Sequence, residues 1–358
     1  MGNDARPLKK PRSKSRKSGG PATLDDSALR PTASTISALA GVAPSTVSRA
    51  LKNDPSISVA TRERIVALAD RLGYRPNAIA RSLITRRSNV VAFIMGELTN
   101  PFYSEQLDLL LELLGEREIQ LMLFHVPTGR DVAEVVPMLL QYQLDACLIA
   151  SVALSSKASD ILAQHRLPTV MINRVPAHRH GCAALCDNEG GGAEVARLLA
   201  ARGVRRPAFV AGHADASTSR DRERGFLEGL RACGLSLGLR LDGDYTIEGG
   251  FRAGLAIAEA DPRPDGVFCA NDIMAFGVLD ALRRKRVAVP RQVQVVGFDD
   301  IRAASWRPYD LTTVAQPMGV LLERAVDLIT ARIREPALLP ETVYVAGSIK
   351  ERGTTRPG

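Results

Sequence analysis

Hydroxyl and guanidinium side chains share one face of a short segment between Gly41 and Leu51. Val47 and Leu51 lie four residues apart, so one helical face carries both, with Ala50 beside them. The other face then presents Ser45, Thr46, Ser48 and Arg49. Such side chains can hydrogen-bond to the phosphate oxygens and base edges of DNA. The segment therefore favours contact with DNA.

Three helices are predicted to position this face. Thr32 can cap the first helix, and Gly41 permits the turn after it. Pro44 suits the first turn of the second helix, and a third helix is expected from about 59 to 72, where Gly73 ends it. The side chains predicted to face inward are Ile36, Leu39, Ala40, Val47, Ala50, Leu51, Ile65, Val66, Leu68, Ala69 and Leu72. This is the helix-turn-helix layout, whose second helix enters the major groove.

Positive charge is concentrated near the N-terminus. Residues 1–31 carry eight Lys and Arg against three Asp and Glu, and residues 32–87 carry nine against three. The remainder is slightly acidic, although the whole chain has a formal net charge of +8. A basic head on a nearly neutral body indicates binding to a polyanion. Residues 1–31 are too polar to fold alone, so we expect either non-specific phosphate contacts or a solvated tail without a defined role.

From residue 89 onward, short apolar runs alternate with amphipathic stretches, which predicts parallel strands covered by helices. The expected strands are Val90–Met95, Gln120–His125, Ala146–Ala150, Thr169–Ile172, Ala183–Cys186, Pro207–Ala211, Gly266–Cys269 and Val293–Phe298. These units are too many for one sheet, so two α/β lobes are predicted. The chain is expected to cross between them near Asp187, near residues 310–318 and near the C-terminus.

Ligands of such folds bind beyond the carboxyl ends of the strands. The residues found there are 98–103, Asn173, Arg174, Arg220, Arg222, Asp244, Tyr245, Asn271, Asp272, Asp299, Asp300 and Gln316. Arg222 has the strongest functional case, because Arg220, Arg222 and Arg224 recur every second residue and cannot share one helical face. Asp272 is expected to cap the helix that follows it, and Asp300 to be structural.

Residues 32–87 resemble the headpiece of the lac repressor family of bacterial transcription regulators. The segments that carry this resemblance are Gly41–Arg49, Val59–Ile65 and Tyr74–Leu83, which look like the recognition helix, third helix and hinge helix. In the body, the segments that resemble the family's effector domain are Cys269–Gly277, Val295–Asp300 and Leu311–Pro317. That domain is similar to periplasmic sugar-binding proteins. One departure is Thr35-Ile36-Ser37, where the family usually has an acidic residue and a Val-Ala pair.

The resemblance implies roles in the head. The base-reading residues would be Pro44, Ser45 and Arg49, and a guanidinium suits the O6 and N7 edge of guanine. The DNA backbone would meet Thr32, Thr46, Ser48, Asn53 and Thr61, with local capping as the alternative for Thr46 and Ser48. The hinge would contact the minor groove through Asn77, Ala80 and Leu83, and Leu83 would act as an apolar wedge. Packing of Leu83 against Ile79 is the alternative, and residues 76–86 are expected to be poorly ordered without DNA.

In the body, the resemblance implies effector binding by Phe102, Asn173, Arg222, Tyr245, Asn271 and Asp299. An aromatic ring that stacks on the ligand, together with polar groups that meet hydroxyls, favours a sugar or a sugar acid. A purine stacked on Tyr245 is the alternative.

We therefore predict an N-terminal all-α helix-turn-helix headpiece with a hinge helix and an α/β two-lobed effector domain. The predicted boundaries are 1–31 for a disordered basic tail, 32–75 for the DNA-binding domain, 76–89 for the hinge and linker, and 90–358 for effector binding and dimerisation. The protein is expected to repress a carbohydrate-related operon by binding a pseudo-palindromic operator as a homodimer. Its effector would order or melt the hinge helices and so change DNA affinity.

Other function classes have less support in the sequence. A dinucleotide-dependent enzyme needs a Gly-rich phosphate turn, and neither Gly96–Pro101 nor Gly190–Gly192 provides one. No catalytic residue, cofactor or metal site is predicted, and five scattered cysteines imply no disulfide framework. No apolar stretch reaches the length of a membrane span, and no secretory signal is recognisable. A cytoplasmic regulator is therefore expected rather than an exported solute-binding protein.

Overall fold

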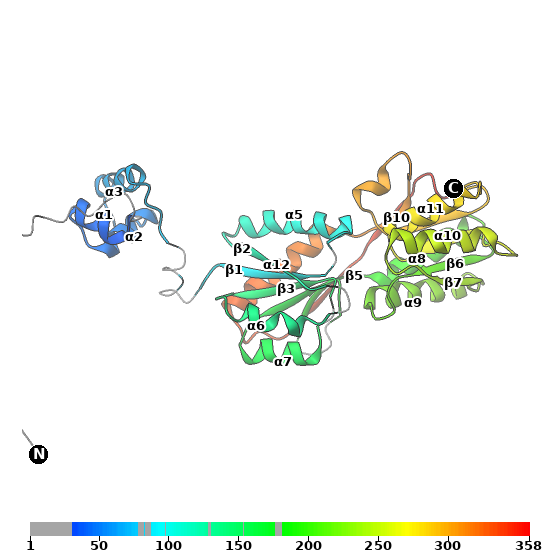
Figure 1. Cartoon of the computed structure of the whole chain (residues 1–358), viewed down its shortest axis with the longest axis horizontal. Helices are drawn as coiled ribbons and strands as arrows, with labels where there is room; N and C mark the ends of the chain where they lie inside the picture. The colour runs from blue at the N-terminus through cyan, green and yellow to red at the C-terminus, as the bar shows by residue number, and fades with distance from the viewer. Residues whose placement is uncertain are drawn as a thin grey trace, which may run out of the picture. The chain divides into compact units, whose positions relative to one another are not determined.

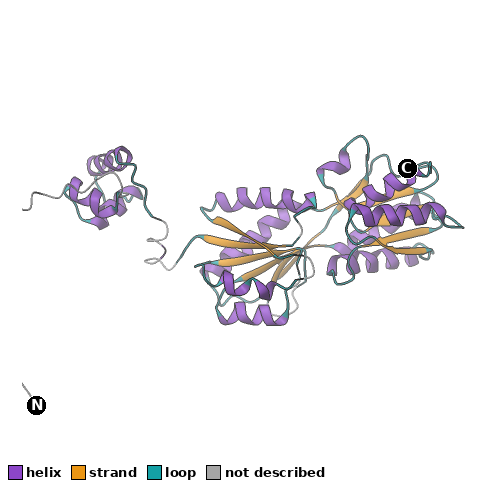
Figure 2. Ribbon diagram, in the orientation of Figure 1, coloured by secondary structure: helices purple, strands orange, loops and turns teal. Residues whose placement is uncertain are grey.

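The computed structural model describes residues 31–77, 82, 87–96, 98–127, 130–152, 154–175 and 181–358 (Figures 1 and 2). The chain divides into two compact units, Met1–Arg81 and Ser82–Gly358, and each is described by itself. The predicted basic tail up to residue 30 lies outside the described residues, as do Ala80, Leu83 and most of the predicted hinge helix.

The described part of the first unit contains three short helices, α1 (Ala33–Ala40), α2 (Pro44–Leu51) and α3 (Val59–Arg71). Thr32 and Thr35 form a reciprocal capping box at the start of α1, in which each hydroxyl accepts the other residue's backbone N–H. Gly41 has a φ of 63°, the left-handed conformation that glycine tolerates best, and ends α1. Pro44 is the first residue of α2. The predicted cap, turn and helix start are thus confirmed.

The core of this unit is centred on one fully buried side chain from each helix, namely Ile36, Val47 and Ile65. Three residues predicted to face inward are instead exposed: Leu39 (62%), Val66 (38%) and Leu72 (36%). Helix α1 buries Ser37 in place of the leucine, and the Ser37 hydroxyl donates to the carbonyl oxygen of Ser34 at 3.0 Å. Short helices enclose a narrow core, so each buries one stripe and leaves flanking apolar positions outside.

The described part of the second unit contains two six-stranded sheets (Figure 2). The first has the order β11-β5-β4-β3-β1-β2 and consists of β1 (Val90–Met95), β2 (Gln120–His125), β3 (Ala146–Ala150), β4 (Thr169–Ile172), β5 (Cys182–Cys186) and β11 (Thr342–Val345). The second has the order β12-β10-β9-β8-β6-β7 and consists of β6 (Pro207–Ala211), β7 (Leu239–Asp242), β8 (Gly266–Cys269), β9 (Gln294–Asp299), β10 (Thr312–Ala315) and β12 (Ser348–Lys350). All paired strands are parallel except β10 and β12. Two α/β lobes are therefore confirmed.

Every strand predicted from the sequence is present, with small shifts at the ends of β5 and β9. The strands that were not predicted are β7, β10, β11 and β12. Three of these, β7, β11 and β12, lie at sheet edges and alternate between exposed and half-buried residues, so they lack a continuous apolar run. The buried strand β10 begins with two threonines and lies where only a crossing was predicted.

Helices cover both faces of each sheet (Figure 1). Against the first sheet, α5 (Pro101–Gly115) and α12 (Met318–Arg334) share one face, and η1 (Val132–Glu134), α6 (Val136–Leu139) and α7 (Ser156–Gln164) share the other. In the second lobe, α8 (Asn188–Ala201) packs on α9 (Ser217–Ala232), and α10 (Ile247–Glu259) packs on α11 (Asp272–Arg284). A short 3-10 helix, η2 (Arg302–Ser305), follows β9. None of the described helices is long and apolar enough to cross a membrane.

The chain passes between the lobes three times. It crosses at Asp187 between β5 and α8, at residues 316–317 between β10 and α12, and at residues 346–347 between β11 and β12. All three places match the predicted crossings. They bring polar residues from both lobes and from the crossing segments into one region.

Candidate functional site

Helix α2 presents the polar face that was predicted to contact DNA. Ser45, Ser48 and Arg49 are exposed, and Thr46 is half-buried. The Arg49 Nε donates to the carbonyl oxygen of Ser45 at 3.4 Å, so the guanidinium lies back along the helix toward its first turn. Pro44 is also exposed at that turn. The exposed face of α2 is therefore a polar surface with one cation, which suits the major groove.

The residues predicted to contact the DNA backbone lie at helix ends. Thr32 caps α1, and the Thr61 hydroxyl in the first turn of α3 accepts a hydrogen bond from the Ser58 hydroxyl at 2.9 Å. Asn53 is exposed just after α2 with a φ of 59°. Thr32 and Thr61 thus have local structural roles, and their phosphate contacts stay a prediction. Of the three residues predicted to contact the minor groove, Asn77 alone is among the described residues.

A cavity of about 280 Å³ opens between the lobes of the second unit. All six predicted effector-binding residues line it: Phe102, Asn173, Arg222, Tyr245, Asn271 and Asp299. They come from α5, the end of β4, α9, the end of β7, the N-cap of α11 and the end of β9 respectively. The structure brings these residues together because carboxyl ends of parallel strands from both sheets open onto the same space.

The sequence interpretation missed part of the cavity wall. The missed residues are Gly96, Pro127, Arg130, Asp131, Ser151, Val152, His213, Asp215 and Thr218. They follow β1, β2, β3 and β6, so a systematic reading of every strand end would have found them. Seven residues that were expected at the cleft do not line the cavity: Leu98, Thr99, Pro101, Arg220, Asp244, Asp272 and Asp300. Arg220 and Arg224 are exposed whereas Arg222 is buried, which confirms that the three arginines do not share one face of α9.

Arg222 is fixed by several partners beside the cavity. Its Nη1 lies 3.4 Å from Asp299 Oδ1, with both side chains about 5% exposed or less. Its Nε donates to Asn188 Oδ1 at 2.8 Å, and its Nη1 donates to the carbonyl oxygen of Ala270. This pair offers a charged donor and a charged acceptor in one place. A hydroxyl group both donates and accepts, so the pair suits a polyhydroxylated ligand.

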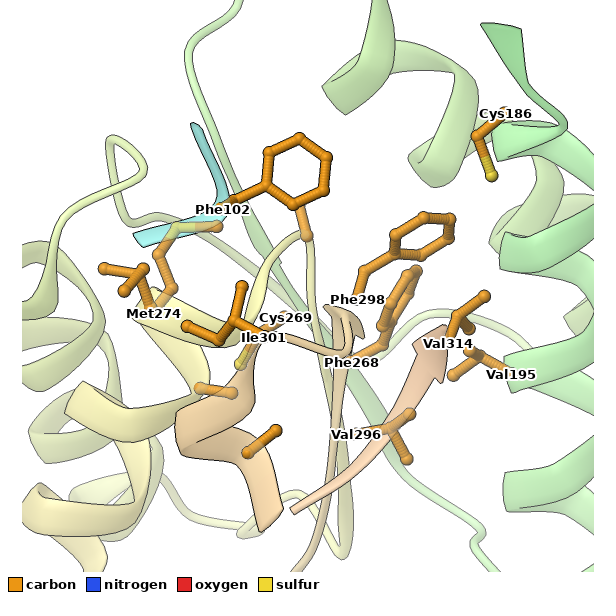
Figure 3. Packing of buried hydrophobic residues seen from close by; sticks show 14 of the residues in the cluster. Phe102, Cys186, Val195, Phe268, Cys269, Met274, Val296, Phe298, Ile301 and Val314 are labelled. Atoms are coloured by element: carbon orange, nitrogen blue, oxygen red, sulfur yellow. The ribbon is translucent and has the colours of Figure 1, made fainter. Parts of the chain in front are cut away.

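An aromatic ring from the core of the second lobe packs against this ion pair. The Arg222 guanidinium carbon lies 3.7 Å from the centre of the Phe298 ring, a cation–π contact. Phe298 lies beside Phe268, with ring centroids 6.4 Å apart, and Val314 is close to both (Figure 3). Burial raises the pKa of Asp299 to about 6, and the charge of Arg222 opposes that rise.

Asn271 caps α11, because its Oδ1 accepts the Met274 N–H at 2.9 Å. The prediction that Asp272 caps this helix is wrong. Asp272 is fully buried and accepts hydrogen bonds from the Thr313 hydroxyl at 2.6 Å and the Ile301 N–H at 3.0 Å. It therefore ties α11 to β10 and to the loop after β9. Burial, together with the nearby charge of Asp299, raises the pKa of Asp272.

Asp300 has the structural role that was predicted for it. Its Oδ1 lies 2.6 Å from Arg352 Nη2, and both side chains are about one-fifth exposed. This ion pair attaches the loop after β9 to the C-terminal segment.

Tyr245 forms an aromatic wall of the cavity. Its hydroxyl lies 3.1 Å from the Thr218 hydroxyl, and its ring meets the His213 ring edge to face at 5.7 Å between centroids. A Cβ added at Gly212 would lie 2.2 Å from the Tyr245 ring. Glycine at this position is therefore required for the ring to occupy its place.

Comparisons with known proteins match both units. Residues 34–77 match the family described as bacterial regulatory proteins, lacI family, and residues 196–355 match the periplasmic binding protein-like domain. The ribose operon repressor of Escherichia coli (strain K12) is 30% identical over 323 residues, which cover 89% of this chain and 98% of that protein.

Solved structures show the same architecture. The complex of the transcriptional regulator CelR with cellobiose has a TM-score of 0.69 at 29% identity and covers 91% of this chain and 100% of that one. The lac repressor dimer bound to operator and an anti-inducer has a TM-score of 0.82 at 23% identity and covers 91% of this chain and 99% of that one. At that identity, the second likeness supports the fold alone.

Proposed function

Because this chain belongs to the lacI family of bacterial regulatory proteins, we propose that it is a repressor that binds operator DNA as a homodimer and responds to a sugar. The observation that carries the proposal is the pairing of two surfaces in one chain. Helix α2 offers an exposed Ser45 and Arg49, and a separate two-lobed body encloses a polar cavity with an aromatic wall. A regulator whose DNA binding responds to a small molecule needs both surfaces.

The cavity wall favours a sugar as the effector. Arg222 and Asp299 match the donors and acceptors of hydroxyl groups, and Tyr245 offers a ring face at one side. A volume of about 280 Å³ suits a small ligand. The ribose operon repressor and the cellobiose complex of CelR give the same indication. We assign effector contact to Phe102 and Asn173 as well, and to Asn271 through its side-chain amide.

In the head, we assign base reading to Pro44, Ser45 and Arg49. The backbone contacts are assigned to Thr32, Thr46, Ser48, Asn53 and Thr61, and the minor-groove contacts to Asn77, Ala80 and Leu83. Such a protein binds the chromosome, so the proposed location is the cytoplasm. Its proposed activity is the binding of DNA and effector, without catalysis. The proposed domains are residues 32–75 for DNA, 76–89 for the hinge, and 90–358 for the effector and the dimer contact.

The experiment begins with genomic fragments selected by the full-length protein, from which an operator is identified. Affinity for this operator and for a scrambled duplex is then measured by fluorescence anisotropy at one fixed salt concentration. Arg49→Ala is expected to weaken operator binding by about 5–150-fold, the equivalent of one bidentate base contact. Arg71→Ala is the control, because it removes one exposed positive charge from α3.

Arg49→Ala and Arg71→Ala should weaken binding to the scrambled duplex equally. Equal losses on the operator would contradict base reading by Arg49, and failure to select any operator would contradict the proposed function. D-ribose, cellobiose, gluconate and hypoxanthine are then added to the operator complex. A change in operator affinity with hypoxanthine alone would replace the sugar by a purine.

A further inference from the structure

Buried polar groups link the two lobes through a continuous series of hydrogen bonds. The Cys186 N–H donates to Asn173 Oδ1 at 2.8 Å, and Asn173 Nδ2 donates to Gln316 Oε1 at 2.6 Å. Gln316 Nε2 then donates to Asp299 Oδ1 at 2.7 Å. The series thus runs from the end of β5, through the second crossing, to the end of β9.

The series returns to its starting residue by another route. Asp299 Oδ1 pairs with Arg222 Nη1 at 3.4 Å, and Arg222 Nε donates to Asn188 Oδ1 at 2.8 Å. Asn188 Nδ2 donates to the carbonyl oxygen of Cys186 at 3.0 Å. The result is a closed circuit, here called the interlobe ring, that begins and ends on the Cys186 backbone. Its side chains are buried: Asn173 (8%), Asn188 (6%), Arg222 (3%), Asp299 (8%) and Gln316 (8%).

Two members of the interlobe ring lie at the crossings. Asn188 begins α8 directly after the first crossing, and Gln316 lies in the second. One end of each amide bonds to a member of the Arg222–Asp299 pair, and the other end bonds to another member of the ring. An amide that donates at one end and accepts at the other fixes its two neighbours relative to each other.

We propose that Asn188 and Gln316 are positioning residues of the effector site, which hold Arg222 and Asp299 in the orientation that meets the effector. The proposal rests on the proposed function for its ligand. The interlobe ring itself can be tested on the protein alone, because Gln316 donates to Asp299, a carboxyl whose pKa is raised by burial.

Several charged or titratable groups face Asp299. They are Arg222 on α9, Asp272 on α11, Glu105 on α5 and Cys186 at the end of β5. Burial raises the pKa of Asp299, whereas Arg222 and the Gln316 hydrogen bond lower it. A folded carboxyl with a raised pKa loses stability as pH rises toward that pKa. Without the Gln316 donor the folded pKa rises further, so that loss continues to higher pH.

The test compares melting temperatures of full-length variants between pH 5 and pH 8. Gln316→Leu removes the donor, and Gln316→Glu keeps the shape but places a second carboxyl beside Asp299. Gln106→Leu is the matched control, because Gln106 is fully buried and, among the residues that the structure describes, its Nε2 donates to Met318 Sδ alone, at 3.8 Å. Asn188→Leu is a second comparison, since Asn188 contacts Arg222 and not Asp299.

For both Gln316 variants, the drop in Tm relative to the wild type should be larger at pH 8 than at pH 5, by about 2–6 °C. Gln106→Leu should lower Tm by the same amount at pH 5 and at pH 8. Asn188→Leu should show a smaller pH-dependent drop than the Gln316 variants, because Asn188 acts on Asp299 only through Arg222. A pH-independent drop in both Gln316 variants would reduce Gln316 to a packing role and overturn the proposal.

The same variants are titrated with D-ribose and with cellobiose by calorimetry. For the sugar that binds to the wild type, Gln316→Leu and Asn188→Leu should each raise the dissociation constant about tenfold, and Gln106→Leu should leave it unchanged. Unchanged affinity in both would overturn the positioning role. If neither sugar binds the wild type, the proposed sugar effector is contradicted, and the melting series alone decides whether the interlobe ring holds Asp299.

Discussion

Replacement of Arg222 by methionine should destabilise the body strongly and in a pH-dependent way. The change removes the only positive charge paired with Asp299 among the described residues. Removal of one partner from a buried ion pair costs about 3–5 kcal/mol. The pair distance of 3.4 Å and the adjoining cavity, which admits solvent, place the expected value near the lower limit, about 3 kcal/mol at pH 8. The corresponding fall in Tm is about 6–12 °C.

The pH dependence follows from the titration of Asp299. Its folded pKa of about 6 lies above the ordinary value of 3.8, and Arg222 is the main charge that opposes the rise. In the variant the folded pKa is higher still, and each additional unit is worth about 1.4 kcal/mol above it. Below the wild-type pKa the carboxyl is protonated in both proteins. The destabilisation should therefore shrink to about 1–2 kcal/mol at pH 5.

The assay is urea denaturation followed by circular dichroism at pH 5 and pH 8. Arg224→Met is the matched control, because Arg224 lies two residues after Arg222 on the same helix, α9, and its side chain is 53% exposed. Its pairs with Glu189 and Asp221 lie at the surface, so the loss should stay within about 0–1 kcal/mol at either pH. Equal losses for the two variants, or a loss for Arg222→Met that does not change with pH, would refute the argument from burial.

Two further predictions concern packing and helix capping. Gly225→Ala should destabilise the body by about 2 kcal/mol or more, because the added Cβ would lie 1.9 Å from the backbone oxygen of Glu189. Gly115→Ala is the control, because a Cβ added there has no neighbour within 4 Å. In the same denaturation assay it should be neutral or slightly stabilising. Thr32→Ala should destabilise the head by about 1 kcal/mol because the capping box with Thr35 is lost, as measured on residues 31–77 by thermal unfolding. Unchanged stability in Gly225→Ala would contradict the packing argument, and unchanged stability in Thr32→Ala would contradict the capping argument.

The sequence predicted most of the inner strands and the site residues at their ends because both leave local signals. The inner strand β10 was missed because it begins with two threonines and so lacks a continuous apolar run. A buried parallel strand is a continuous apolar run, and the polar residue directly after it must lie at the sheet's carboxyl edge. The edge strands β7, β11 and β12 lack that run and were missed. The choice between Asn271 and Asp272 as helix cap could not be made locally, since both are good N-cap residues and the backbone conformation decides.

The interlobe ring was invisible to the same reasoning for a different physical reason. Gln316 was noted as a polar residue of the segment Leu311–Pro317 but was given no role, and Asn188 was not noted at all, because neither carries a charge. Their importance arises mainly from hydrogen bonds between residues far apart in the sequence, such as the one from Asn173 to Gln316, where the separation is 143 residues. Sequence patterns indicate burial and periodicity, whereas the interlobe ring exists only when both crossing segments are folded.

That circuit has a consequence for how an effector could act on the body. The Arg222–Asp299 pair lines the cavity, and two of its other partners lie at the crossings. Asn188 directly follows the first crossing, and Gln316 lies in the second. An effector hydroxyl that binds this pair competes with, or adds to, hydrogen bonds that already end on the crossings. Since a buried amide left without its partner costs about 1–3 kcal/mol, even one rearranged bond is comparable with the 1–3 kcal/mol typical of coupling between two sites. The chemistry of effector recognition and the arrangement of the lobes are therefore expected to change together, and a variant that opens the interlobe ring should alter both effector affinity and the effector's influence on operator binding.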